Sequence, residues 1–312
     1  MRKVAFLFSG QGAQYPGMGQ DFFEEFEAAR EVFRAADDVL GFDLTSLVFK
    51  GTKEDLKKTE ITQPAVMTTS LAIFMVLREE FQLVPQGAAG LSLGEYTALT
   101  AAGVFELKDS IRLVQKRARL MQEGVPQGKG CMAAILGLSK DKVEEACREA
   151  KSWGLVSPAN YNCPGQIVIA GEKEAVEEAV KLSKEKGAKR TAILPMSVPS
   201  HCALLKSAGD KLGEILSGIS TGEFSFPVVS NVKAEYYKTG EEVKELLSSQ
   251  LSQPVLWEES IRLLIKDGFN LFVEVGPGNT LTGFMKKIDR NVSCYPVGDK
   301  SSLEKVIKEL EG

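Results

Sequence analysis

The chain has 312 residues, 44% of them hydrophobic, and a formal net charge of −4 from 38 basic and 42 acidic residues. This length suits one large domain or two modest ones, since domains commonly span about 100–200 residues. No basic tail or stripe points to nucleic acid, and no apolar run reaches the roughly 18 residues of a membrane span. The sequence therefore indicates a globular protein with neither nucleic acid nor membrane as a partner.

Two residue counts restrict the chemistry. The five cysteines are odd in number, widely spaced and without a C-x-x-C pair, so we expect no disulfide framework, no metal site and a cytoplasmic location. The chain has one histidine, His201, so any imidazole chemistry depends on it. A purely structural role for this histidine is the alternative.

The first part of the chain covers residues 1–124. It opens with an apolar strand at 3–8, which a Gly-rich turn follows. Apolar periodicity then predicts three helices, over 64–81, 93–102 and 107–123.

Residues 125–198 have a different pattern. The expected elements are, in order, a strand at 131–136, a helix at 140–151, strands at 155–161 and 166–170, a helix at 172–186 and a strand at 189–194. A turn over 162–165 separates the two middle strands. The order βαββαβ is that of the ferredoxin-like split unit. We therefore expect a small domain over 125–198.

Residues 199–312 return to mixed α/β structure. Strands are expected at 226–230, 270–275 and 291–297, and a helix at 255–266. The whole chain is therefore expected to be α/β, with residues 1–124 and 199–312 forming a large domain into which the small one is inserted.

Residues 90–94 read Gly-Leu-Ser-Leu-Gly, which matches the G-x-S-x-G pattern of a nucleophile elbow. Glycines on both sides let the chain turn sharply from a strand into a helix, so that the serine oxygen projects at the helix start. The pattern also occurs by chance in Gly- and Ser-rich loops. Here small apolar residues precede it and a helical run follows, and this context makes Ser92 the candidate nucleophile.

Such a nucleophile needs N–H groups that stabilise the oxyanion formed on attack. One normally belongs to the next residue, here Leu93, and the second to a loop after an early strand. Residues 9–14, Ser-Gly-Gln-Gly-Ala-Gln, form such a loop, and the glycines around Gln11 let its amide approach a ligand. An ordinary Gly-rich connection is the alternative. A dinucleotide fingerprint is excluded, because Tyr15 replaces its last glycine.

Arg117 borders the apolar stripe of the expected helix 107–123 and has no acidic neighbour on it. Its neighbours three and four residues away are Leu113, Val114, Leu120 and Met121. A buried guanidinium without an acceptor costs several kcal/mol. Three acceptors are open: a carboxylate from elsewhere in the fold, water reached by snorkelling, or a ligand carboxylate held by two parallel hydrogen bonds.

In combination these motifs resemble the malonyl-CoA:acyl carrier protein transacylases of bacterial fatty acid synthesis. The resemblance covers nearly the whole chain, in order. It rests on residues 8–14, 90–96, 117, 160–166, 197–202, 250–257 and 274–278. One position departs from the pattern: Leu91 stands where many members carry histidine, which accounts for the single histidine of this chain.

The resemblance implies a catalytic role for five residues. Ser92 would carry the acyl group and His201 would be its general base. The histidine would be held by the main-chain carbonyl of Gln250 rather than by an acid. The amides of Gln11 and Leu93 would form the oxyanion hole.

The resemblance also implies how the substrate is bound. Arg117 would bind the malonyl carboxylate, and Asn162 would lie at the substrate. The partners would be malonyl-CoA and acyl carrier protein, with no metal or other cofactor. The implied fold is an α/β-hydrolase-like large domain with a ferredoxin-like insert, in agreement with the βαββαβ pattern.

Other functions remain open at this point. A serine esterase or thioesterase would use an acidic third member and admit water, and it would not need Arg117. A non-catalytic binding module would not need an intact Ser92 and His201. Cys202 as nucleophile is disfavoured, because no cysteine-hydrolase signature surrounds it. With the ordinary imidazole pKa, activity should fall below about pH 6.5.

Overall fold

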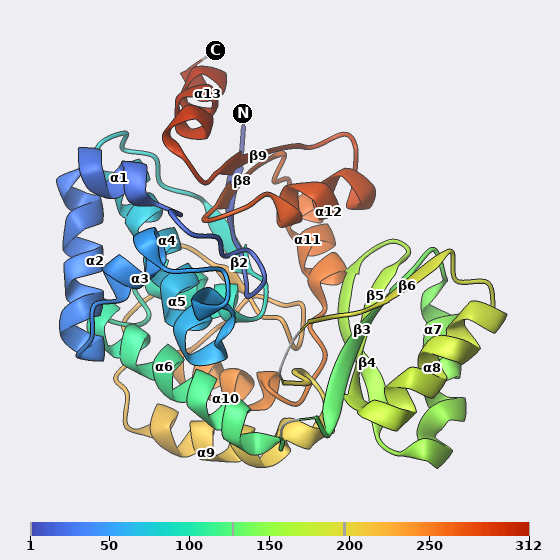
Figure 1. Ribbon diagram of the computed structural model, residues 1–312. Helices are drawn as coiled ribbons and strands as arrows, with labels where there is room; N and C mark the ends of the chain where they lie inside the picture. Colours follow the sequence, from blue (N-terminus) through green and yellow to red (C-terminus); the bar gives the residue numbers. More distant parts are fainter. Residues whose placement is uncertain (1, 127, 196–197, 312) are drawn as a thin grey trace.

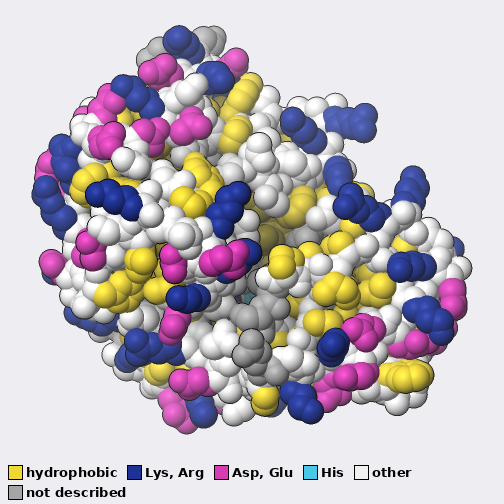
Figure 2. Space-filling model, viewed as in Figure 1, with side chains coloured by type: hydrophobic (Ala, Val, Ile, Leu, Met, Phe, Trp, Pro, Cys, Tyr) yellow, Lys and Arg dark blue, Asp and Glu magenta, His cyan; other side chains and the backbone are white. Residues whose placement is uncertain are grey.

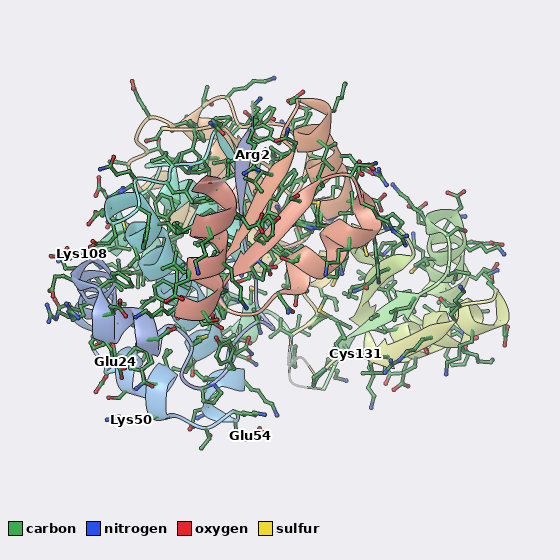
Figure 3. The ribbon with its side chains drawn as sticks, turned by 90° about the horizontal axis from the view of Figure 1, so that it is seen from above. Arg2, Glu24, Lys50, Glu54, Lys108 and Cys131 are labelled. Atoms are coloured by element: carbon green, nitrogen blue, oxygen red, sulfur yellow. The ribbon has the colours of Figure 1, made fainter. Side chains whose placement is uncertain are left out.

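A computed structural model describes residues 2–126, 128–195 and 198–311. They form an α/β protein with a parallel sheet in the large part of the molecule and a separate antiparallel sheet beside it (Figure 1). Seen from above, the antiparallel sheet and its helices stand to one side of the large part (Figure 3). Ser197, which opens one of the motifs above, lies outside the described residues.

The large sheet has five parallel strands in the order β7-β2-β1-β8-β9. They are β1 (Val4–Phe8), β2 (Gly87–Gly90), β7 (Val228–Val229), β8 (Leu271–Val275) and β9 (Ser293–Val297). The first four are buried along their whole length, which explains why their residues are apolar or small, with the exception of Glu274 in β8. Because the strands are parallel, the loops after β1, β2 and β7 meet at one edge, where α/β proteins place their sites.

Helices cover both faces of this sheet. Before the small sheet the chain forms α1 (Gln20–Glu25), α2 (Glu27–Leu40), α3 (Leu44–Lys50), the 3-10 turn η1 (Asp55–Lys57), α4 (Thr59–Glu79), α5 (Leu93–Ala101) and α6 (Leu107–Gly124). After it come the 3-10 turn η3 (Ala203–Leu205), α9 (Lys206–Ser217), α10 (Gly240–Gln250), α11 (Trp257–Lys266), α12 (Thr280–Ile288) and α13 (Lys300–Glu311). Along β1, Phe6 and Phe8 enter one hydrophobic cluster and Ala5 and Leu7 the other, as strand alternation requires.

Helix α4 is a core helix of the large part. Among the described residues it is the one helix long and apolar enough to cross a membrane, but 83% of its apolar window is buried inside the protein. Its Phe74 makes edge-to-face contacts with Phe6 and Phe8 of β1, with ring centroids 6.2 and 6.1 Å apart. The apolar side chains of α4 therefore pack against the sheet.

The small sheet confirms the expected βαββαβ order. Its elements are β3 (Gly130–Leu136), α7 (Lys140–Glu149), the 3-10 turn η2 (Ala150–Trp153), β4 (Val156–Cys163), β5 (Gln166–Glu172), α8 (Lys173–Glu185) and β6 (Arg190–Ile193), and the antiparallel strand order is β4-β5-β3-β6. On β3, Ala133 and Ile135 pack with α7 and α8, whereas Met132 and Ala134 join a cluster on the opposite face. That second face is turned toward the large part (Figure 1).

Of the expected boundaries that were wrong, two have tertiary reasons. The strand expected at 226–230 is the two-residue β7, because it pairs with only two residues of β2. The helix expected at 255–266 begins at Trp257, because Val255 pairs instead with Asn160 of β4 in an isolated parallel bridge. This bridge ties the small sheet to the large part.

Candidate active site

Residues 90–94 form the expected sharp turn from β2 into α5. Ser92 at its apex has φ 55° and ψ −105°, a backbone conformation that non-glycine residues rarely adopt. A Cβ on Gly90 would lie 1.9 Å from the carbonyl group of Gly94, and one on Gly94 would lie 2.1 Å from the Phe8 oxygen. Both glycines are therefore required by close backbone contact, and the turn projects the serine at the edge of the sheet.

The imidazole of His201 lies against this serine. Its Nε2 is 2.7 Å from Ser92 Oγ, and its Nδ1 is 2.8 Å from the main-chain oxygen of Gln250, the last residue of α10. A carbonyl oxygen only accepts, so Nδ1 carries the proton and the lone pair of Nε2 faces the hydroxyl. The structure thus brings together the three residues expected to form the catalytic group.

The imidazole of His201 stays neutral at pH values well below the ordinary imidazole pKa. Burial and, secondly, the nearby charge of Arg117 lower the pKa of His201 to about 4, against the opposing effect of the hydrogen bond to Gln250. The expectation of activity loss below pH 6.5 used the unperturbed imidazole pKa, and burial of the ring moves the expected loss to lower pH. The base stays available in moderately acidic solution.

Arg117 on α6 is buried, with 1% of its surface exposed, which excludes snorkelling. Its Nη1 donates to Gln63 Oε1 at 2.7 Å, and its Nη2 lies 3.1 Å from Gln250 Oε1 and 3.2 Å from Ser92 Oγ. Its face also lies over the Tyr96 ring, 5.0 Å from the centroid. All these acceptors are neutral, so within the described part of the chain the cation is anchored beside the nucleophile without an ion pair.

The loop after β1 lies directly against the elbow. A Cβ on Gly10 would be 2.4 Å from the Leu91 oxygen, so only glycine allows this approach. Gln11 lines the cavity at the serine, and Leu93 is the first residue of α5. Among the described residues neither the Gln11 nor the Leu93 amide has a hydrogen-bond acceptor. Both are therefore available to a ligand.

A cavity of about 210 Å³ leads to the serine. Met132, Ala134 and Val168 of the small sheet form one wall, and Thr280 and Phe284 of α12 form another. Figure 2 shows the hollow between the two parts of the molecule, with hydrophobic side chains along the small part.

Asn162 lies in the wall of this cavity. The turn expected at 162–165 is shorter than that, because Asn162 and Cys163 belong to β4. The side chain of Asn162 is buried, and its Oδ1 has no hydrogen-bond partner among the described residues. An orphan acceptor at the cavity is a place for a donor group of a ligand.

Two further residues of the site were missed from the sequence. Asn231 Oδ1 accepts from the Ser92 amide and its Nδ2 donates to the Gly90 oxygen, both at 2.7 Å. Gln63 of α4 anchors Arg117. Asn231 follows β7, so the rule that sites form at strand ends offered a signal for it, whereas Gln63 carries no sequence signal.

The elbow serine, with an imidazole on its oxygen and unpaired amides at Gln11 and Leu93, is typical of an enzyme of acyl transfer. The family model described as acyl transferase domain matches residues 5–308. A full-length relative from Bacillus subtilis, named malonyl CoA-acyl carrier protein transacylase, is 44% identical over 100% of this chain and 98% of the relative. An Escherichia coli relative of the same name is 44% identical over 97% of this chain and 98% of its own.

Two solved structures that this chain matches are also malonyl transacylases. The malonyl CoA-acyl carrier protein transacylase of Clostridium perfringens matches with a TM-score of 0.95 and 44% identity, covering 99% of this chain and 97% of that one. A malonyl-transacylase solved in complex with a type II PKS acyl-carrier protein matches with a TM-score of 0.96 and 45% identity, covering 98% of this chain and 99% of that one. The chain belongs to the acyl transferase family and, within it, to the malonyl CoA-acyl carrier protein transacylases.

Proposed function

We propose that this enzyme, an acyl-carrier-protein S-malonyltransferase, moves a malonyl group from malonyl-CoA to the phosphopantetheine thiol of acyl carrier protein and so supplies fatty acid biosynthesis. The observation that carries the proposal is the position of Arg117. Its guanidinium lies 3.2 Å from Ser92 Oγ and is buried, and its acceptors among the described residues are neutral. A cation so placed selects an acyl group with a free carboxylate, which it binds by two parallel hydrogen bonds.

In the first half-reaction Ser92 Oγ attacks the thioester carbonyl while Nε2 of His201 takes the hydroxyl proton. The carbonyl oxygen becomes an oxyanion that the amides of Gln11 and Leu93 bind, each donor contributing about 3–4 kcal/mol to the transition state. The carbon–sulfur bond then breaks, and the CoA sulfur leaves with the proton from the imidazolium. The malonyl ester of Ser92 remains.

In the second half-reaction the phosphopantetheine thiol attacks this ester. His201 takes the thiol proton as the new carbon–sulfur bond forms, and it returns the proton to Ser92 Oγ as the ester breaks. No metal, nucleotide or redox cofactor takes part. The carbonyl of Gln250 keeps the imidazole in the required tautomer throughout, a role supported by the 2.8 Å contact to Nδ1.

The surroundings of the site disfavour an esterase on the same scaffold. A general esterase has no use for the charge of Arg117 in its acyl pocket. Among the described residues the partner of His201 Nδ1 is a main-chain carbonyl rather than a carboxylate. Asn162 would accept a hydrogen bond from the substrate at the cavity wall, which its unpaired Oδ1 and its place in the lining support.

The same proposal extends to the architecture. Residues 1–124 and 199–312 would be an α/β-hydrolase-like domain and residues 125–198 a ferredoxin-like insert. The five parallel strands support the first assignment and the strand order β4-β5-β3-β6 supports the second. Five free cysteines support a cytoplasmic location.

Mass spectrometry of the intact enzyme tests the function. The wild type should gain a malonyl group from malonyl-CoA and little acetyl group from acetyl-CoA, and peptide mapping should place the adduct on Ser92. Ser92→Ala should abolish it. Arg117→Ala should abolish the preference for malonyl over acetyl. A variant without Arg117 that still prefers malonyl would overturn the role of the cation.

A further inference from the structure

Glu95 is a buried carboxylate one residue past the elbow glycine, on the side of α5 away from the cavity. Its side chain has no exposed surface and does not line the cavity. Its Oε1 accepts from the Tyr237 hydroxyl at 2.7 Å and from the Asn231 amide at 2.8 Å. Its Oε2 accepts from Gln250 Nε2 at 2.5 Å. Three donors aimed at one buried carboxyl group indicate a carboxylate with a defined task.

The Gln250 side chain links this carboxylate to Arg117. Its Nε2 faces Glu95 and its Oε1 faces the guanidinium of Arg117, so the positive end of the amide dipole lies at the anion and the negative end at the cation. Its main-chain oxygen accepts from His201. One residue therefore joins the buried anion, the buried cation and the catalytic base.

The other oxygen of Glu95, Oε1, supports the elbow. It accepts from the Asn231 amide, and the Asn231 side chain in turn holds the Ser92 amide and the Gly90 oxygen. Glu95 thus contacts both groups that fix the nucleophile, the base and the cation, yet it touches none of the reacting atoms.

A direct ion pair between Glu95 and Arg117 would occupy the N–H groups that a ligand carboxylate needs. The interposed amide avoids this, because it keeps the opposite charges close enough to attract while the guanidinium still faces Ser92. Burial raises the pKa of Glu95 to about 7, while its hydrogen bonds and the charge of Arg117 hold it lower than burial alone would. The group is therefore largely ionised at pH 8.

We propose that Glu95 is a positioning residue that acts as a spaced counter-charge for Arg117, and this inference rests on the proposed function. It balances the guanidinium when the acyl pocket is empty. When a malonyl carboxylate occupies the pocket, the Glu95 anion repels it and limits how tightly Arg117 holds it. The malonyl ester is thereby bound selectively but remains free to leave with the carrier thiol.

The test is the ratio of malonyl to acetyl acylation of Ser92, measured as kcat/KM at pH 8 for the full chain. Glu95→Gln keeps the shape and an acceptor for Gln250 but removes the charge. The ratio should rise roughly three- to tenfold, with a lower KM for malonyl-CoA, because the repulsion of the substrate carboxylate is gone. If Glu95 had only a structural role, Glu95→Gln would slow acylation by malonyl-CoA and by acetyl-CoA equally and leave the ratio unchanged.

Tyr237→Phe gives an independent measurement if Glu95→Gln does not fold. It removes one donor to the carboxylate, so Glu95 takes up a proton more readily and the ratio should rise by about twofold. Glu274→Gln is the matched control. Glu274 is buried too, but its oxygens accept from the Leu281 and Thr282 amides of α12. The ratio of malonyl to acetyl acylation in this variant should equal that of the wild type. An unchanged or lower ratio in the folded Glu95 or Tyr237 variant overturns the proposal. A wild type without malonyl preference overturns the proposed function itself.

Discussion

The Nε2 atom of His201 lies 2.7 Å from Ser92 Oγ, although 109 residues separate the two in the chain. Both have positive φ angles, 61° for His201 and 55° for Ser92, and such a backbone conformation costs about 1–3 kcal/mol in a non-glycine residue. Hydrogen bonds to another element stabilise the strained backbone of His201. Its amide donates to the Leu251 oxygen, and its ring donates to the Gln250 oxygen. The end of α10 thus aligns the base with the nucleophile before any substrate arrives.

Removal of the imidazole should slow the acylation of Ser92 by about 10²–10⁴-fold, the range for a general base in direct contact with its proton. His201→Ala should leave the binding of malonyl-CoA nearly unchanged. Single-turnover release of CoA measures the effect. Ser200→Ala is the control, because its hydroxyl contacts Met132 rather than the nucleophile, and it should stay within a few-fold of the wild type. A loss smaller than tenfold in His201→Ala would mean that another group accepts the proton.

The acylation rate at saturating malonyl-CoA should stay level from pH 8 to about pH 5 and fall only near pH 4. Burial and the charge of Arg117 lower the pKa of His201 to about 4, so the neutral base persists well below the ordinary value of 6.5. Single-turnover rates across this range, in buffers of constant ionic strength, give the midpoint. A midpoint near 6.5 would show that the ring is hydrated in the working enzyme.

The buried imidazole of His201 should also make the fold less stable in acid. Between pH 6.5 and about 4 the unfolded chain binds a proton on His201 that the folded chain does not, so the free energy of unfolding decreases as the pH falls through this window. Glu95 acts in the opposite direction, because its pKa is raised to about 7 in the folded state. His201→Gln removes only the first effect. Its urea midpoint should therefore decrease less than that of the wild type between pH 7 and pH 5.

The local part of the site could be predicted from the sequence. The turn at 90–94 follows the local G-x-S-x-G pattern, in which Gly90 is required by its contact with Gly94, and the βαββαβ order follows from periodicity and turn residues. The acceptors of Arg117 could not be predicted. Helix geometry excluded a partner on α6, but it gave no sign that amides from α4 and α10 would take the place of a carboxylate. Those contacts depend on how distant helices pack.

The acid–base behaviour was also outside the reach of the sequence. The composition gives His201 its ordinary pKa, whereas burial and a neighbouring cation set the value in the fold. Glu95 illustrates the same limit, since its motif shows a glutamate after the elbow but not that its side chain is buried against Gln250 and Tyr237.

Gln63 should control the affinity for malonyl-CoA. Its Oε1 accepts from Arg117 Nη1 at 2.7 Å, and a hydrogen bond to a charged group contributes about 1.5–3 kcal/mol. Gln63→Ala should therefore raise the KM for malonyl-CoA at least tenfold, because the guanidinium loses one of its anchors. The rate of acetyl transfer, which does not use the cation, serves as the internal control and should change less than twofold. Equal losses with both donors would assign Gln63 to packing alone.

Two glycine-to-alanine variants should have opposite effects on stability. In Gly90→Ala the new Cβ meets the main chain of Gly94 at 1.9 Å, and no flexible side chain can yield, so α5 must move away from β2. We expect a loss above about 4 kcal/mol together with loss of Ser92 acylation. Gly283 lies exposed in α12 with no atom within 4 Å of its added Cβ, so Gly283→Ala should stabilise the protein by about 0.5–1 kcal/mol through its helix propensity. Thermal unfolding and Ser92 acylation should be measured for both variants. If only Gly90→Ala is destabilised, the cause is its backbone contact and not glycine replacement in general. Wild-type activity in Gly90→Ala would show that the elbow does not depend on this contact.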